Sequence, residues 1–195
     1  MLPRIPPSVG LSASDERNQN MTKVFCVLLL LSLCASAQHE NLAVYRVDEN
    51  VFRGKQPTKI DVPELAARGI KTVLDLRGGM PWERQAVEAA GMKYVRIGLS
   101  GLFAPTEQQM DKILAVLENP ALVPVFVHCR RGADRTGLVI ACYRIDHDRW
   151  TNAQAMKEAR EQGFSRLKIL MRRYVEHFTA EKRSATGRLA QVSAT

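Results

Sequence analysis

The sequence VPVFVHCRRGADRTG, residues 123–137, carries the strongest structural signal in the chain. Its first six residues are mostly apolar, which predicts a buried strand of the parallel kind over 123–128. A glycine-containing loop follows, and a helix is expected over 135–147. In a parallel sheet, ligands bind at the loops that leave the carboxyl ends of the strands. This strand, loop and helix therefore place a candidate site at the carboxyl edge of a sheet.

Hydrophobic periodicity on either side of this stretch predicts strands that alternate with helices. Strands are expected over 43–47, 50–53, 70–76 and 92–97, and helices over 61–68, 81–90, 106–118, 151–162 and 165–182. The alternation predicts an α/β fold with a central, mostly parallel sheet flanked by helices. Thr106 is the expected N-cap of its helix, although position 109 lacks the acidic residue of a capping box.

The composition fits a globular protein with an anionic partner. The chain has 195 residues, of which 46% are hydrophobic and 25% charged, and this excludes collagen-like or largely disordered classes. A net charge of +8 suits a phosphorylated substrate, a membrane surface or nucleic acid. Aromatic residues make up only 6%, so a nucleic-acid surface is not indicated. The four cysteines include no CxxC pair, which argues against a zinc site or a disulfide framework.

The N-terminal region has the pattern of a secretory signal peptide. Residues 24–33, VFCVLLLLSL, form an apolar run that is too short to span a bilayer, which needs about 20 residues. Lys23 precedes the run, and the small-residue site that ends at Ala37 follows it. We therefore expect a signal peptide over 21–37, cleavage near Ala37, and export to the periplasm or beyond. The alternatives are lipidation at Cys34 and a buried core helix.

The expected domain organisation follows from this signal. Residues 1–20 are expected to be a non-native or disordered extension that precedes the true start at Met21. The folded domain is expected over 43–182, with a disordered tail over 183–195 and no stable membrane span.

The loop at 128–137 has the chemistry of a phosphate cradle. Successive backbone N–H groups and a helix N-terminus together bind anions, and Gly132 permits the backbone conformation that such a loop needs. The same groups lower the pKa of a cysteine from about 8.5 to roughly 3.5–7.5, so Cys129 is the candidate nucleophile. The planar guanidinium of Arg135 can hold two phosphoryl oxygens. The expected phosphate-binding loop comprises Arg130, Arg131, Gly132, Ala133 and Asp134.

Two residues beside the loop have supporting roles in this interpretation. His128 is expected to orient the loop through hydrogen bonds to its backbone. The hydroxyl of Thr136 is placed to donate a hydrogen bond to the departing thiolate.

This loop resembles the HCxxGxxR[ST]G signature of the cysteine-dependent protein tyrosine phosphatase superfamily, and most closely its compact dual-specificity branch with secreted bacterial members. The matching positions are His128, Cys129, Gly132, Arg135, Thr136 and Gly137. The resemblance covers about 45–178 and includes the segments FRGKQP, IKTVLDLR, YVRIGL and PVFVHC. Rhodanese-like sulfurtransferases also place a cysteine before a helix, but their loops have fewer residues between cysteine and arginine.

The resemblance implies a metal-free phosphomonoesterase without a cofactor. Cys129 attacks phosphorus to form a phosphocysteine, which water then hydrolyses. The implied substrates are phosphotyrosine proteins, with phosphoserine and phosphothreonine as further possibilities. Inositol phosphates or phosphoinositides are the alternative, which the Arg130-Arg131 pair and Asp134 favour. A non-catalytic phosphate-binding module is the third interpretation.

The general acid is the point at which this sequence departs from the family. The family takes its acid from an aspartate about 30 residues before the cysteine, but the corresponding segment here, GLSGLFAP over 98–105, contains no carboxylate. Asp134 in the cradle is the expected acid, as in related loops with the sequence GKDRTG. The alternatives are Glu107, Asp111, or water, with Asp134 acting only as a helix cap or as a partner of an arginine.

Other polar and sulfur side chains have weaker expected roles. Arg53, Lys55 and Arg77 either rim the pocket or pair with an acid such as Glu83. Cys142 is expected to be packed in the core rather than to act as a redox partner of Cys129.

Overall fold

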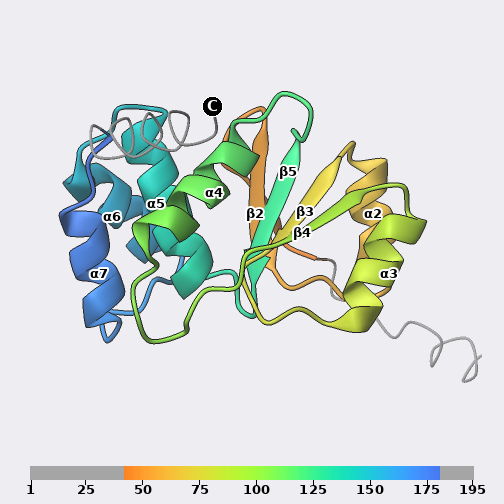
Figure 1. The fold of residues 1–195 in the computed structure, drawn as a ribbon, viewed down its shortest axis with the longest axis horizontal. Coiled ribbons are helices and arrows are strands. Elements are labelled where there is room, and N and C mark those ends of the chain that lie inside the picture. Colours follow the sequence, from red (N-terminus) through yellow and green to blue (C-terminus); the bar gives the residue numbers. More distant parts are fainter. Residues whose placement is uncertain (1–41, 181–195) are drawn as a thin grey trace, which may run out of the picture. The chain divides into compact units, whose positions relative to one another are not determined.

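The computed structural model describes residues 42–180. The expected extension over 1–20, the signal peptide over 21–37 and the tail over 183–195 lie outside the described residues. Within 42–180, no helix is both long and apolar enough to cross a membrane. The core of the described chain is a five-stranded sheet with helices on both faces (Figure 1).

The sheet has the strand order β1-β2-β5-β3-β4. Its strands are β1 (Val44–Arg46), β2 (Val51–Lys55), β3 (Thr72–Asp75), β4 (Lys93–Arg96) and β5 (Val125–Cys129). The first pair, β1 and β2, is antiparallel, and all the other pairs are parallel. The expectation of a mostly parallel sheet is therefore confirmed, and the central strand β5 ends at Cys129.

Two groups of helices cover the sheet (Figure 1). The helices α2 (Asp61–Ala67) and α3 (Pro81–Ala89) lie on one face, and α4 (Glu107–Leu117), α5 (Asp134–Asp146), α6 (Asn152–Glu161) and α7 (Ile169–Glu176) lie on the other. Alternate side chains of β5 enter the two cores: Val125 and Val127 pack with the second group, whereas Phe126 packs with the first. This period-two alternation directs Cys129 and His128 to opposite faces of the sheet.

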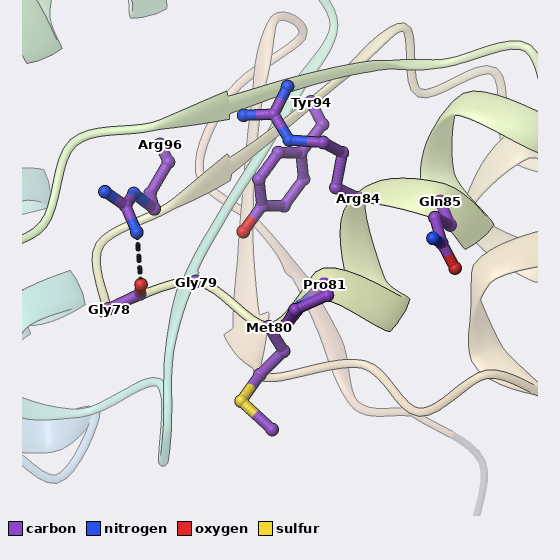
Figure 2. A pocket seen from close by; sticks show the side chains of 8 residues that line it. All are labelled: Gly78, Gly79, Met80, Pro81, Arg84, Gln85, Tyr94 and Arg96. Carbon is purple, nitrogen blue, oxygen red and sulfur yellow. Dashed lines mark hydrogen bonds between the residues drawn. The ribbon is translucent and has the colours of Figure 1, made fainter.

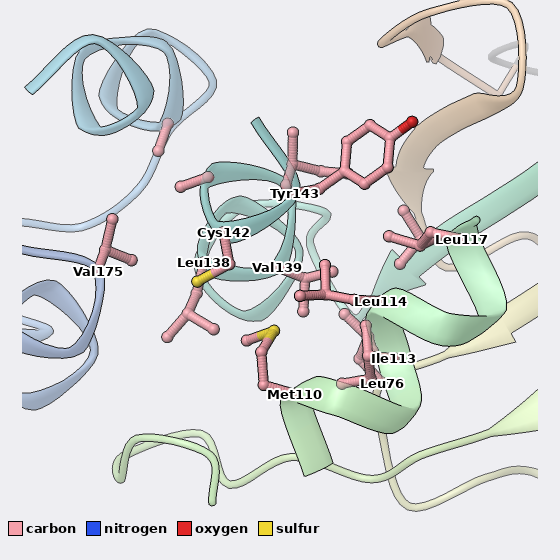
Figure 3. Close-up of a cluster of buried hydrophobic side chains, with 14 of the residues drawn as sticks. Leu76, Met110, Ile113, Leu114, Leu117, Leu138, Val139, Cys142, Tyr143 and Val175 are labelled. Carbon is pink, nitrogen blue, oxygen red and sulfur yellow. The ribbon is translucent and has the colours of Figure 1, made fainter. Parts of the chain in front are cut away.

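Helix α5 is buried on nearly every side, and its position fixes the cradle that precedes it. It packs between α4 and α7, and Figure 3 shows Leu138, Val139, Cys142 and Tyr143 in this core. Eleven of its thirteen residues are buried, so its neighbours cover it on nearly every side. The N-terminus of α5 is therefore held rigidly against the end of β5.

Two details of the helices differ from the prediction. The N-cap of α4, Thr106, has a complete capping box, because its side chain accepts from the N–H of Gln109 and the Gln109 side-chain oxygen accepts from the N–H of Thr106. An amide oxygen thus replaces the expected acid. The helix predicted over 165–182 is shorter and runs only over Ile169–Glu176. Residues 166 and 167 form a turn instead, and the N–H of Ser165 donates to Asp134 Oδ1, 2.9 Å away.

Candidate active site

The cradle is a four-residue loop, 130–133, between the end of β5 and the start of α5. Gly132 has a φ of +72°, a conformation that residues with a Cβ rarely adopt. A Cβ at this position would also lie 2.4 Å from the carbonyl oxygen of Gly54 in β2. Glycine is therefore required both for the turn and for the close packing of the loop on β2.

Arg53 of β2 holds this loop from behind. It is only 3% exposed, and its Nη2 donates to the carbonyl oxygen of Gly132 over 2.7 Å. Because a trans peptide unit directs its C=O and N–H to opposite sides, this bond turns the N–H of Ala133 away from Arg53. The register of β2 places Arg53 inside the protein, behind the cradle, where it lines a small cavity with Arg131 and Gly132 rather than pairing with Glu83.

The charge of Arg53 also acts on the nucleophile. Burial lowers the pKa of the Arg53 guanidinium, whereas the negative charges of Glu158 and Cys129 act in the opposite direction. The interaction between Arg53 and Cys129 is reciprocal, so the guanidinium stabilises the thiolate of Cys129. Nη1 of Arg53 is buried without a hydrogen-bond partner among residues 42–180.

Cys129 lies at the base of the cradle and is 3% exposed. Burial by itself would raise its pKa, but hydrogen bonds from the Thr136 side chain and from the backbone of Thr136, Arg131 and Gly132 outweigh it and lower the pKa below the ordinary value. The hydroxyl oxygen of Thr136 has no other hydrogen-bond partner in the described part of the chain. The sulfur is thus surrounded by donors that favour its ionised form.

Arg135 ties the cradle to the neighbouring loops. Its Nη1 lies 3.3 Å from the carbonyl oxygens of both Leu76 and Leu99 and donates to them. These carbonyls follow β3 and β4, so the guanidinium connects the carboxyl ends of three strands. The side chains of Arg130 and Arg131 are exposed, and Ala133 is partly buried between them and α5.

His128 and Glu83 form a buried pair on the opposite face of the sheet. Nε2 of His128 lies 2.9 Å from Oε1 of Glu83, and both side chains are fully buried. Gln56 donates to the other oxygen of Glu83 over 2.7 Å, and its backbone N–H donates to the carbonyl of Arg130. The predicted bonds from the His128 ring to the loop backbone are wrong, because strand alternation turns the ring toward α3. Glu83 and Gln56 support the loop instead.

Sequence reasoning missed this support, although a signal was present. Glu83 precedes Val87 by one helical turn on the buried face of α3. A carboxylate at such a position needs a buried partner. His128 is that partner.

Asp134 lies in the first turn of α5 with both carboxylate oxygens engaged. Oδ2 accepts from Nη2 of Arg131 over 2.7 Å, and Oδ1 accepts from the N–H of Ser165. It makes no side-chain cap of α5. Of the alternative acids, both of which lie in α4, Glu107 is exposed and Asp111 is partly buried.

A cavity of about 690 Å³ opens beside the loop after β3. Figure 2 shows Arg84 of α3 over the ring of Tyr94, with a guanidinium carbon 5.1 Å from the ring centre, while Arg96 donates to the carbonyl of Gly78. The Tyr94 hydroxyl is itself held by the buried Asp75, over 2.8 Å. None of the eight residues that line this cavity is acidic. The cavity is therefore a basic hollow.

Comparison with known proteins matches the chain to a family model described as "DSP-PTPase phosphatase fused to NAD+ Kinase", over residues 20–176. The dual specificity protein phosphatase TpbA of Pseudomonas aeruginosa is 30% identical over 139 residues, which are 67% of this chain and 59% of that protein. The inositol diphosphatase DSP1 of rice, Oryza sativa subsp. japonica, is 27% identical over 138 residues, or 68% and 62% of the two chains.

A solved structure shares the fold. The catalytic domain of the PP-IP phosphatase SIW14 from S. cerevisiae, in complex with citrate, superposes with a TM-score of 0.65 and 25% identity. The match covers 78% of this chain and 93% of that one. The family match, the relatives and the shared fold agree that this chain belongs to the dual-specificity-like branch of the cysteine-dependent protein tyrosine phosphatases and is a phosphoric monoester hydrolase.

Proposed function

We propose that this phosphatase hydrolyses phosphotyrosine in proteins, with Cys129 as its nucleophile and without a metal ion. The lowered pKa of Cys129 in a loop of inward-directed donors carries this proposal. A thiolate is a strong nucleophile, and the donors that stabilise it are also suited to the oxygens of a phosphoryl group.

The proposed reaction has two balanced steps. The Cys129 thiolate forms an S–P bond while the ester P–O bond breaks, and Asp134 gives its proton to the leaving oxygen. Water then attacks the phosphocysteine, the S–P bond breaks, and the proton lost by water returns to Asp134. Arg135 and the loop N–H groups balance the charge on the phosphoryl oxygens in both steps.

The role of Asp134 is part of this proposal. To act as the acid, the Asp134 carboxyl must carry a proton and must exchange Arg131 or Ser165 for the leaving oxygen. Arg131 is 70% exposed, but the Asp134 side chain is only 10% exposed, so the leaving oxygen must replace the guanidinium as a hydrogen-bond partner of Asp134. The segment over 98–105 brings no carboxylate that would compete for this role.

A direct assay tests the proposal. Purified protein is given p-nitrophenyl phosphate, a phosphotyrosine peptide, phosphoserine and phosphothreonine peptides, and inositol hexakisphosphate, each with and without EDTA. We expect hydrolysis of the first two substrates and no effect of EDTA. Loss of activity with EDTA would contradict the metal-free mechanism, and no turnover of any substrate would favour a phosphate-binding module.

The basic cavity of Figure 2 favours inositol phosphates or phosphoinositides as a second candidate class. Its edge, Gly78, lies two residues from Leu76, whose carbonyl accepts from Arg135. A substrate with several phosphates is therefore able to place one in the cradle and another near Arg84 and Arg96. A substrate with a single phosphate gains nothing from these two arginines.

Replacing both Arg84 and Arg96 with alanine tests this second candidate. If it holds, kcat/KM for inositol hexakisphosphate falls about tenfold more than kcat/KM for p-nitrophenyl phosphate, because charge-assisted bonds to a second phosphate are lost. Arg68→Ala is the matched control, since it removes an exposed cation that pairs with Glu64 on α2. Equal falls in kcat/KM on both substrates would contradict this second candidate and leave phosphoproteins as the supported substrate class.

Arg53 gives a prediction about the pH profile. Arg53→Met removes a positive charge close to Cys129, so the pKa of the thiol rises and the acid limb of kcat/KM for p-nitrophenyl phosphate moves upward by about one pH unit. Arg53→Lys keeps the positive charge, so its acid limb is expected at the wild-type pH. Its kcat is expected to stay below the wild-type value, because a single ammonium replaces the planar guanidinium that holds Gly132. An Arg53→Met variant that is folded and has an unchanged profile would reduce Arg53 to a structural role.

A further inference from the structure

Two surface segments beside the cradle expose an unusual amount of apolar surface. Eight large hydrophobic side chains are exposed within residues 42–180, and five of them lie on the segments 98–105 and 163–170. These five, with their exposed fractions, are Leu102 (67%), Phe103 (63%), Leu167 (86%), Ile169 (50%) and Leu170 (46%). Single exposed hydrophobic residues are ordinary, but a group of this kind marks an interaction surface.

The two segments form one surface, which we call the apolar rim. Nζ of Lys168 donates to the carbonyl oxygen of Gly101 over 2.6 Å and joins them. In Figure 1 the loop before α4 and the start of α7 accordingly lie side by side. The Ser100 hydroxyl accepts from the N–H groups of Leu102 and Phe103, so these two apolar residues sit on a hydrogen-bonded turn.

The apolar rim is attached to the cradle at two points. The carbonyl oxygen of Leu99, in the first segment, accepts from Arg135. The N–H of Ser165, in the second segment, donates to Asp134. Both bonds reach residues on which the proposed reaction depends. The rim therefore lies at the same end of the sheet as the phosphate cradle.

The charged side chains within the rim are basic, and the exposed acids nearest to it in sequence, Glu107 and Glu161, lie two residues outside its segments. Neither segment contains an aspartate or a glutamate, whereas the second contains Arg166 and Lys168. Arg130 and Arg131 of the cradle loop are exposed on the adjoining surface. Protruding apolar side chains among basic residues match an anionic lipid surface: the apolar groups enter the boundary of the acyl chains, and the cations contact the headgroups.

We propose that the apolar rim docks this protein on anionic phospholipid bilayers, with the cradle facing the membrane. The proposal rests on the proposed function only in placing the cradle beside phosphorylated headgroups, since the docking itself requires no catalysis. Separate protruding side chains need no complementary pocket in a lipid partner, whereas a protein partner would have to be shaped to fit them.

Vesicle sedimentation tests the proposal. The full chain is mixed with phosphatidylcholine vesicles that either contain or lack phosphatidylglycerol. We expect sedimentation with the anionic vesicles, which added salt weakens, and much less with the neutral ones. The double variant Phe103→Asp with Leu167→Asp is expected to bind the anionic vesicles at least about tenfold more weakly, because it removes apolar contacts and adds negative charge.

The controls separate docking from catalysis. Ile60→Asp carries the same kind of change at a side chain that is 68% exposed beside α2, and it is expected to bind as the wild type does. The double variant is expected to hydrolyse dissolved p-nitrophenyl phosphate at the wild-type rate. Failure of the wild type to bind anionic vesicles, or undiminished binding by the double variant, would overturn the docking proposal. If the wild type did not hydrolyse p-nitrophenyl phosphate, that result would instead count against the proposed function.

Discussion

Replacing Cys129 with serine is expected to lower turnover of p-nitrophenyl phosphate by at least about 10⁴-fold while the protein stays folded. The donors around this position lower the pKa of a thiol, but a serine hydroxyl starts far too high for them to ionise it. Serine is nearly the same size as cysteine, so the surrounding loop keeps its shape. The measurement is kcat, together with the thermal unfolding midpoint of both proteins.

Cys142 supplies the matched control for this variant. It is fully buried in α5, and burial raises its pKa well above the ordinary value, so it remains a neutral thiol. Cys142→Ala is expected to cost about 1 kcal/mol of folding free energy through the lost packing and to leave kcat unchanged. Comparable activity in the Cys129→Ser variant and the wild type would remove Cys129 from the mechanism.

Asp134→Asn is expected to lower kcat by about 10²-fold on a phosphotyrosine peptide, within the range for loss of a general acid. The loss should be much smaller on p-nitrophenyl phosphate, because nitrophenolate leaves readily without a proton. The asparagine oxygen still accepts from Ser165 or Arg131, so the loop is expected to stay in place. The measurement is the ratio of kcat values on the two substrates.

Glu107→Gln is the companion variant for this test. Glu107 lies in the first turn of α4 and is one of the other carboxylates considered for the role. We expect Glu107→Gln to give the same ratio of kcat values on the phosphotyrosine peptide and p-nitrophenyl phosphate as the wild type. If Asp134→Asn turned over the phosphotyrosine peptide at a near-normal rate, the acid would be Glu107, Asp111 or water.

The sheet and the order of its elements were predictable because they depend on local pattern. The apolar run before Cys129 has the length of a buried strand, and several helices have an amphipathic pattern. The loop was predictable because few sequences place a cysteine, a glycine and an arginine at these spacings. The bounds of α7 were not, because the local pattern does not show that the segment before Ile169 turns and bonds to Asp134, 31 residues before Ser165.

The residues behind the cradle show where sequence reasoning fails. Arginine is usually found at the protein surface, and only the register of Arg53 in β2 places it under Gly132. The side chain of His128 can lie on either face of the sheet, and the alternation along β5 places it on the face that holds Glu83. The place of Arg53 requires the pairing of β2 with β5, and the contact of His128 with Glu83 requires α3 to pack on that face of the sheet. A local pattern contains neither.

The pH dependence of Cys129 alkylation tests the central claim most directly. The full chain is treated with iodoacetamide across a pH series, and the labelled cysteine is identified by mass spectrometry. If the cradle lowers the pKa of Cys129, half-maximal labelling occurs clearly below the ordinary thiol value of about 8.5, and inorganic phosphate slows it. Labelling that follows an ordinary thiol, or a Cys129 that does not react at any pH, would contradict the account.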